Sequence, residues 1–279
     1  MSQKVNLPKF LRPYENKNLT RLGNEYDGGY LVDKIKVKES DVLISFGISY
    51  DWSFEKDFYK LNKCEILTFD GSVGLRFFYA KAKNRIKNTL ENKNLSYFYK
   101  TIWWFILPLR FFSFFNNFNL RKIKKHYELF VYEDIKHIDF EYFVEKNGYE
   151  PKFIKFKEIM EHQEIQKKVF LKIDIEGEEY SLLESIVKYQ NRLVSLVIEF
   201  HDLEKENYEI LKGFIKKFSL ILSHTHINIS GGFNHDKTPR VVELTFVNDL
   251  NNTIKVSELP HPLDMPTYKT DIKYEISFL

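Results

Sequence analysis

The sequence predicts a doubly wound α/β fold with a mostly parallel central sheet. Short apolar runs alternate along the chain with longer stretches of helical periodicity. Several runs, such as VLISF, VFLKI and LVSLVIEF, lack strict alternation, as expected for strands covered by helices on both faces. Glycine is scarce, at 11 of 279 residues, and most glycines follow an apolar run, where a strand gives way to a turn.

Six apolar runs are the candidate strands of this sheet. They are residues 42–46, 65–69, 169–173, 193–200, 220–226 and 241–247. Three intervening stretches place their apolar residues on one helical face, which predicts helices at 52–62, 178–190 and 204–218. Prolines 239, 260, 262 and 266 punctuate the last part of the chain, so we expect antiparallel pairing at an edge of the sheet there.

A segment at about 75–139 interrupts the alternation of strands and helices. It holds a predicted basic helix at 80–91, the aromatic run TIWWFILPLRFFSFFNNF, and the basic run RKIKKH. We therefore predict a single domain over residues 1–279 with an inserted helical segment at about 75–139.

The aromatic run of this segment is too interrupted for a membrane span. Pro108 and Arg110 stand near its centre, and a spanning helix needs about 20 mainly apolar residues. We expect residues 101–125 to pack on the body, to form a homodimer contact, or to meet a membrane surface.

Composition excludes several classes of protein. Lys and Arg number 42 against 39 acids, so the formal charge of +3 argues against a nucleic-acid partner. The single Cys64 excludes a disulfide framework and a Cys-rich zinc site. The first residues contain no apolar stretch typical of a secretory signal. We expect a cytoplasmic protein, with peripheral membrane attachment as the alternative.

The first predicted strand ends at Gly47, where a turn leads into a helix. This arrangement suits a nucleotide-like ligand. The dinucleotide pattern G-x-G-x-x-G is absent, because Ser49 and Trp52 occupy its second and third glycine positions. A cofactor with a pyrophosphate, such as NAD, is therefore disfavoured.

An acidic residue, Asp70, ends the second predicted strand and precedes Gly71 and Ser72. At this place in a doubly wound sheet, a carboxylate can accept hydrogen bonds from ribose hydroxyls. The alternative is a purely structural Asx-turn before the glycine.

Carboxylate and imidazole groups lie at the ends of three later predicted strands. They are Asp174, Glu176, Glu199, His201, His224 and His226, with Asn228 beyond them. Glu199 and His201 are two residues apart and so share one side of their strand. Ligands of open α/β sheets bind at this carboxyl edge, although each histidine also has a structural interpretation as a hydrogen-bonded group.

These segments resemble a known family, the FkbM-type S-adenosylmethionine-dependent methyltransferases. LKIDIEGEEYSLLESI is similar to the hallmark of that family. The blocks RLGNEYDGGYLVD, ISFGISYDWSFEKDF, LTFDGS, LVIEFHDL, HTHIN and PRVVELTFV resemble one branch of it in the same order. The resemblance covers nearly the whole chain outside residues 75–139.

The resemblance implies a Rossmann-like methyltransferase sheet that binds S-adenosyl-L-methionine. The matching positions expected to bind this cofactor are Gly28, Gly29, Tyr30, Gly47, Ser49, Glu55, Asp70, Gly71, Ser72, Asp174 and Glu176. It also implies an O-methyltransferase for a hydroxyl of a sugar or other small polyhydroxylated metabolite, in surface-glycan or secondary-metabolite biosynthesis. The loop after Gly47 departs from the glycine-richer run usual in methyltransferases.

A hydroxyl acceptor has a high pKa, so its methylation needs a general base or a metal ion. The candidate bases are His201 and His226, with His201 ahead because Glu199 is placed to orient its ring. Asp174 and Glu199 are the supporting carboxylates. The alternative is a divalent metal ion held by Asp174, Glu199 and His201.

Two other functions are consistent with the sequence. One is an α/β binding module without catalysis, held at the membrane surface in a glycan-assembly complex through Trp103, Trp104 and the RKIKK run. The other is an NAD-dependent oxidoreductase or epimerase, which the missing glycine pattern disfavours. Binding of S-adenosylhomocysteine in preference to NAD would separate the leading function from both.

Overall fold

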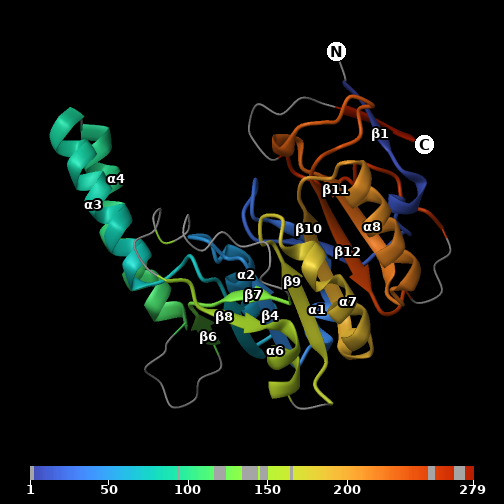
Figure 1. Ribbon diagram of the computed structural model, residues 1–279, viewed down its shortest axis with the longest axis horizontal. Helices are drawn as coiled ribbons and strands as arrows, with labels where there is room; N and C mark the ends of the chain where they lie inside the picture. Colours follow the sequence, from blue (N-terminus) through green and yellow to red (C-terminus); the bar gives the residue numbers. More distant parts are fainter. Residues whose placement is uncertain are drawn as a thin grey trace.

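The computed structural model describes residues 3–92, 95–115, 124–133, 144, 150–163, 166–250, 255–266 and 274–279. Its centre is a seven-stranded sheet with the order β11-β12-β10-β9-β4-β5-β6 (Figure 1). The strands are β4 (Val42–Phe46), β5 (Glu65–Phe69), β6 (Lys124–Tyr127), β9 (Val169–Ile173), β10 (Leu193–Phe200), β11 (Ile221–Ile227) and β12 (Val242–Val247). The predicted fold class, a doubly wound Rossmann-like sheet, is confirmed.

Helices cover both faces of the sheet, as its continuous apolar strands predict. They are α1 (Lys34–Glu39), α2 (Ser53–Leu61), α3 (Leu75–Asn92), α4 (Leu95–Phe115), α6 (Phe156–His162), α7 (Glu179–Tyr189) and α8 (Lys205–Lys217). Alternate side chains of β4 point to opposite faces. Ile44 and Phe46 join the core beneath α6, α7 and α8, whereas Leu43 packs with α1 and α2.

Three two-stranded sheets complete the part of the fold that the structure describes. They are β1 (Gln3–Leu7) with β13 (Tyr274–Phe278), β2 (Leu19–Leu22) with β3 (Tyr30–Asp33), and β7 (Phe130–Tyr132) with β8 (Phe153–Lys155). Short 3-10 turns lie at η1 (Lys9–Leu11), η3 (Gln190–Arg192) and η4 (Ile229–Gly231). The β2–β3 hairpin lies against β10 and β12, which brings residues near the start of the chain beside the carboxyl end of the sheet.

One strand of the main sheet runs against the others. Within the described residues, β12 pairs antiparallel with both β10 and β11, and the remaining pairings of the sheet are parallel. The antiparallel pairing predicted at an edge of the sheet is confirmed, because the edge strand β11 pairs antiparallel with β12. The strand that itself runs against the others, β12, lies one position inside this edge and is buried along most of its length, so both of its sides need a hydrogen-bonded neighbour.

The direction of winding reverses between β4 and β9. The chain adds β5 and β6 outward on one side of β4, then returns to add β9 and β10 on the other side. Connections on the two sides lead to opposite faces, which leaves a crevice beyond the carboxyl ends of β4 and β9. This is the standard position for a ligand in an open α/β sheet.

The segment predicted as an insertion has two structural parts. Helices α3 and α4 form a hairpin that extends away from the sheet (Figure 1). Beyond them, β6 pairs in parallel with β5 and so belongs to the main sheet. Residues 93–94, 116–123 and 134–139 of the predicted insertion, including the first part of RKIKKH, lie outside the described residues. No helix in the described ranges is both long enough and apolar enough to cross a membrane.

Candidate active site

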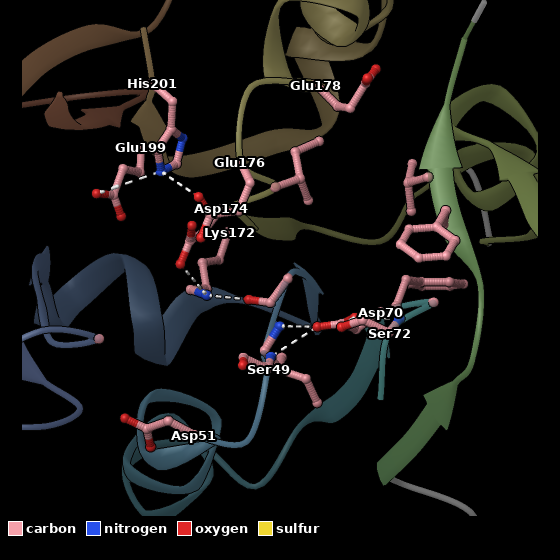
Figure 2. A pocket seen from close by; sticks show the side chains of 18 of the residues that line it. Ser49, Asp51, Asp70, Ser72, Lys172, Asp174, Glu176, Glu178, Glu199 and His201 are labelled. Carbon is pink, nitrogen blue, oxygen red and sulfur yellow. Dashed lines mark hydrogen bonds and ion pairs between the residues drawn. The ribbon is translucent and has the colours of Figure 1, made fainter. Parts of the chain in front are cut away.

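A cavity of about 1080 Å³ opens along the carboxyl ends of β5, β4, β9 and β10 (Figure 2). The sequence-predicted residues that line it are Gly28, Gly47, Ser49, Asp70, Gly71, Ser72, Asp174, Glu176, Glu199 and His201. The predicted residues Gly29, Tyr30, Glu55 and His226 are not among its lining residues. The fold thus gathers most of the expected side chains into one site at the crevice.

The loop after β4 needs glycine at its first position. Gly47 has φ of 70°, and a Cβ atom there would lie 1.5 Å from the carbonyl oxygen of Asp174. The ends of β4 and β9 are therefore in direct backbone contact. Lys172 strengthens this contact, since its buried Nζ donates a 2.7 Å hydrogen bond to the carbonyl oxygen of Gly47.

Asp70 holds the same loop from the other side. Its Oδ2 accepts hydrogen bonds from the backbone N–H groups of Ile48 and Ser49, at 3.0 and 2.8 Å. Its Oδ1 accepts from the backbone N–H and the hydroxyl of Ser72, at 2.8 and 2.6 Å. Oδ1 of Asp70 thus forms the Asx-turn that the sequence offered as the structural alternative. A contact from this oxygen to a ribose stays a prediction, and it requires the Ser72 hydroxyl to turn away.

An aromatic wall that the sequence reasoning missed faces this loop. Phe130 on β7 and Phe153 on β8 both line the cavity, with ring centroids 5.8 Å apart. A Cβ atom at Gly71 would lie 2.1 Å from the Phe130 ring, so glycine is what admits the ring there. Flat aromatic faces suit a purine base. The signal that could have found the wall is the aromatic density between residues 127 and 153.

The imidazole of His201 stands at the end of β10 beside a buried carboxylate. Its Nδ1 lies 3.3 Å from Oε1 of Glu179, and its backbone N–H donates to the same oxygen at 2.6 Å. The other oxygen of Glu179 accepts from the backbone N–H of Gly177 at 2.8 Å. Glu199 was predicted to orient His201, but its Oε1 is 3.9 Å from Nε2. The orienting residue is Glu179.

The surroundings of His201 change its affinity for a proton. Burial lowers the pKa of the imidazole, but the hydrogen bond and charge of Glu179, with the charges of Glu199 and Asp174, outweigh burial and raise it to about 9. The ring is therefore protonated at neutral pH. It becomes a base once a cation nearby or a higher pH removes that proton.

Tyr30 bridges two acids beneath the cavity. Its hydroxyl lies 2.9 Å from Oδ2 of Asp174 and 3.2 Å from Oε2 of Glu199. Burial, together with the charges of Asp174 and Glu243, raises the pKa of Glu199 well above its ordinary value. A protonated Glu199 can donate to Tyr30, which then donates to Asp174. Tyr30 was expected to bind the cofactor, but it does not line the cavity and instead contacts Asp174 and Glu199, which do.

Three other predicted residues serve the protein interior. Glu55 is fully buried on α2 and accepts a hydrogen bond from the Ser45 hydroxyl at 2.6 Å. Gly29 belongs to a tight turn, where a Cβ atom would lie 2.0 Å from a backbone oxygen. His226 lies on β11, two strands from β10, with Nδ1 3.4 Å from Oδ1 of Asp264. The structure does not bring these residues to the cavity.

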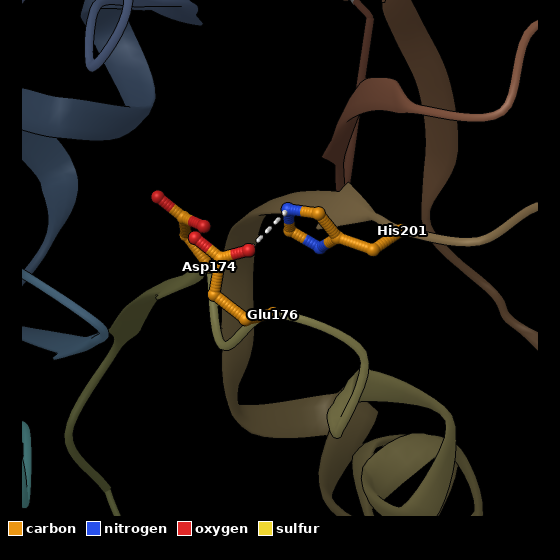
Figure 3. Close-up of side chains that lie close together, drawn as sticks. All are labelled: Asp174, Glu176 and His201. Atoms are coloured by element: carbon orange, nitrogen blue, oxygen red, sulfur yellow. Dashed lines mark ion pairs between the residues drawn. The ribbon is translucent and has the colours of Figure 1, made fainter. Parts of the chain in front are cut away.

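A group that could hold a metal ion lies in the same cavity. Asp174, Glu176 and His201 each offer one ligand atom, and these atoms lie within 4.8 Å of one another (Figure 3). Glu176 takes the place predicted for Glu199, because the two Glu199 oxygens already contact Tyr30 and Asn228. Carboxylate oxygens and an imidazole nitrogen suit a divalent cation.

Comparisons with known proteins found one weak structural likeness that can be described. No protein-family model matches the chain, and no curated protein matches it. Among solved structures, the chain is similar to M. jannaschii TYW2 in complex with AdoMet, at 11% sequence identity and a TM-score of 0.29. The match covers 84% of this chain and 88% of that chain. A likeness at this level does not bear on the function of the chain.

Proposed function

We propose that this chain is an S-adenosylmethionine-dependent O-methyltransferase for a hydroxyl of a sugar or another small polyhydroxylated metabolite, in surface-glycan or secondary-metabolite biosynthesis. The observation that carries the proposal is the composition of one cavity. Its β4–β5 end has the loop, acid and aromatic wall suited to a nucleoside, and its β9–β10 end has an acid–base group. The resemblance of these segments to FkbM-type methyltransferases supports the same assignment.

The nucleoside end favours this cofactor over NAD. Gly47 and Ser49 present a short loop without the second and third glycines that a pyrophosphate needs. Asp70 lies at the end of β5, the position at which a carboxylate binds a ribose in doubly wound folds, and the Phe130 ring in the same cavity is suited to stack on an adenine. A cavity of about 1080 Å³ is large enough for the cofactor together with a small acceptor.

The acid–base end fits a cationic methyl donor. Asp174 and Glu176 place two carboxyl groups beside the imidazole of His201, so a sulfonium is attracted to this end. The same positive charge lowers the pKa of His201 and favours its neutral form. Binding of the donor thus prepares the base.

Methyl transfer then needs alignment and removal of one proton. When bound, the cofactor would supply a methyl group for in-line attack by the acceptor oxygen, with the carbon–sulfur bond breaking to leave a neutral thioether. Nε2 of His201 accepts the hydroxyl proton, while Glu179 holds Nδ1 and so fixes the ring. A divalent ion on Asp174, Glu176 and His201 would instead acidify the hydroxyl directly.

The experiment that tests the cofactor is calorimetry with S-adenosylhomocysteine and with NAD. We expect micromolar binding of the first and no measurable binding of the second. Tighter binding of NAD than of S-adenosylhomocysteine would favour an oxidoreductase instead. Binding of neither compound would favour a binding module without catalysis.

Asp70→Ala tests the ribose contact. We expect the binding free energy of S-adenosylhomocysteine to become about 1 to 3 kcal/mol less favourable, because charged hydrogen bonds to the ribose are lost. The loop at Ile48 and Ser49 also loses the carboxylate that holds it. Ser72→Ala is the matched control, since it removes only a hydroxyl that the ribose would displace. An unchanged Kd in a folded Asp70→Ala protein would exclude Asp70 from the binding site.

The raised pKa of His201 predicts the pH dependence of the reaction. A base with a pKa of about 9 is protonated below that pH, so kcat/KM for the cofactor should rise about tenfold per pH unit and level off near pH 9. Glu179→Gln removes the group that raises this pKa, so its inflection should move to lower pH. A profile that is flat between pH 6 and 9 would be inconsistent with His201 as the base.

Chelation separates a base from a metal ion. With His201 as the base, we expect activity to survive dialysis against EDTA and to be insensitive to added Mg²⁺ or Mn²⁺. Loss of activity with EDTA, and recovery with one of these ions, would assign Asp174, Glu176 and His201 as ligands.

A further inference from the structure

The helical hairpin of α3 and α4 has one apolar face that the protein covers. Trp104, Leu107 and Phe111 of α4 are buried, and they form a core with Trp52 and Phe78. The spacing of these α4 residues, three and four apart, is that of one helix face. This contact anchors the base of the hairpin to the body of the protein.

A second apolar stripe lies along another face of α4 and is exposed. Ile102, Phe105, Ile106 and Leu109 follow the spacing of one helix face and are 40%, 53%, 42% and 71% exposed. The hairpin that carries this stripe projects from the sheet (Figure 1). A contiguous apolar stripe of this size marks a contact surface.

The charge of residues 75–115 favours an anionic partner for the stripe. Residues 75–115 hold eight Lys or Arg residues and a single acid, Glu91. The whole chain carries a formal charge of only +3, so the rest of it is net acidic. The positive charge is thus concentrated on the element that carries the exposed apolar stripe, which suits an anionic surface with an apolar interior.

A second cavity lies at the base of α4, beside the stripe. Its volume is about 630 Å³, and its lining includes the cations Lys56, Arg110 and Lys124 and the acid Asp51. In the part of the chain that the structure describes, none of the three cations forms an ion pair. Nζ of Lys124 lies over the rings of Tyr59 and Phe114, at 4.3 and 4.5 Å from their centroids. Lys56 and Arg110 are therefore the cations of this cavity that suit a phosphate group.

We propose that the α3–α4 hairpin docks the protein on an anionic phospholipid membrane. The stripe enters the boundary between headgroups and acyl chains, and the second cavity receives a lipid phosphate. Trp103 lines both this cavity and the candidate active site, so docking places the mouth of the active site at the membrane surface. Docking does not rest on the proposed methyltransferase activity, but it would make a lipid-linked acceptor accessible to that site.

Vesicle flotation with the full chain tests the proposal. Vesicles of phosphatidylcholine alone are compared with vesicles that also contain phosphatidylglycerol, at low and high salt. We expect binding that requires the anionic lipid and weakens with salt. The double variant Phe105→Ser/Leu109→Ser should bind at least tenfold more weakly, and Lys56→Ala/Arg110→Ala about tenfold more weakly. Ile35→Ser/Ile210→Ser is the matched control, because both side chains are exposed and apolar but lie on α1 and α8.

The wild-type protein provides a measurement that does not depend on any variant. Its tryptophan fluorescence should be quenched by bromine-labelled lipid in anionic vesicles, because Trp103 is 41% exposed beside the stripe. Absence of quenching and of flotation would overturn the proposal, as would equal binding to neutral vesicles. Light scattering that shows a dimer in the wild type and a monomer in Phe105→Ser/Leu109→Ser would assign the stripe to a second copy. Binding of inorganic phosphate without binding of vesicles would also overturn it.

Discussion

Replacing His201 with alanine should lower the turnover of methyl transfer by about 10² or more while leaving the Kd for S-adenosylhomocysteine nearly unchanged. The imidazole lies at the β10 end of the cavity, and its Nδ1 is held by the buried carboxylate of Glu179 at 3.3 Å. Its loss removes the proton acceptor without touching the loop at Gly47 or the carboxylate of Asp70. Turnover and calorimetry on the same preparation measure the two effects.

His226→Ala is the matched control for this prediction. Both histidines are candidate bases from the sequence, but only His201 lines the cavity. Turnover of His226→Ala should therefore stay close to that of the wild type at temperatures where the protein is folded. If His226→Ala loses turnover and His201→Ala keeps it, the assignment of the base is wrong.

Glu179→Gln should give a smaller loss of turnover than His201→Ala. The amide keeps a hydrogen-bonding oxygen near Nδ1 but removes the charge that stabilises the imidazolium. A merely structural role for Glu179 would not shift the pH profile, whereas a positioning role should. The shift of the inflection to lower pH thus distinguishes the two.

The sheet was predictable because its strands are buried on both faces. The runs 42–46, 65–69, 169–173 and 193–200 coincide with β4, β5, β9 and β10. Burial on both faces makes each run apolar throughout, and the turn that follows limits its length. Since parallel strands end at the same edge, their terminal side chains were also expected to meet there.

The groups that support the site were harder to predict. Glu179 lies at the start of the helix predicted at 178–190, where the helix dipole alone favours an acid. Lys172 sits within an apolar strand, and a buried lysine is rare. Tyr30 reaches Asp174 across 144 residues of sequence. Each depends on a tertiary contact that has no local pattern.

Gly47→Ala should have the largest effect on stability among the single changes considered. The residue needs positive φ, and the added Cβ would lie 1.5 Å from the Asp174 carbonyl oxygen and 2.6 Å from its carbonyl carbon. Neither backbone segment can give way without breaking sheet hydrogen bonds, because the N–H of Asp174 donates to Phe46 and that of Gly47 to Phe69. We expect a loss of more than about 3 kcal/mol in the free energy of unfolding, measured by urea denaturation.

Two other glycines separate the clash from backbone strain. Gly177 also has positive φ, at 108°, but a Cβ atom added there would have no atom within 4 Å, so Gly177→Ala should cost about 1 to 3 kcal/mol from strain alone. Gly213 lies within α8 with open space around it, so Gly213→Ala should stabilise the protein by about 0.5 to 1 kcal/mol. The order of the three free energies is the test. If Gly47→Ala is no worse than Gly177→Ala, the ends of β4 and β9 do not meet as closely as the candidate site requires.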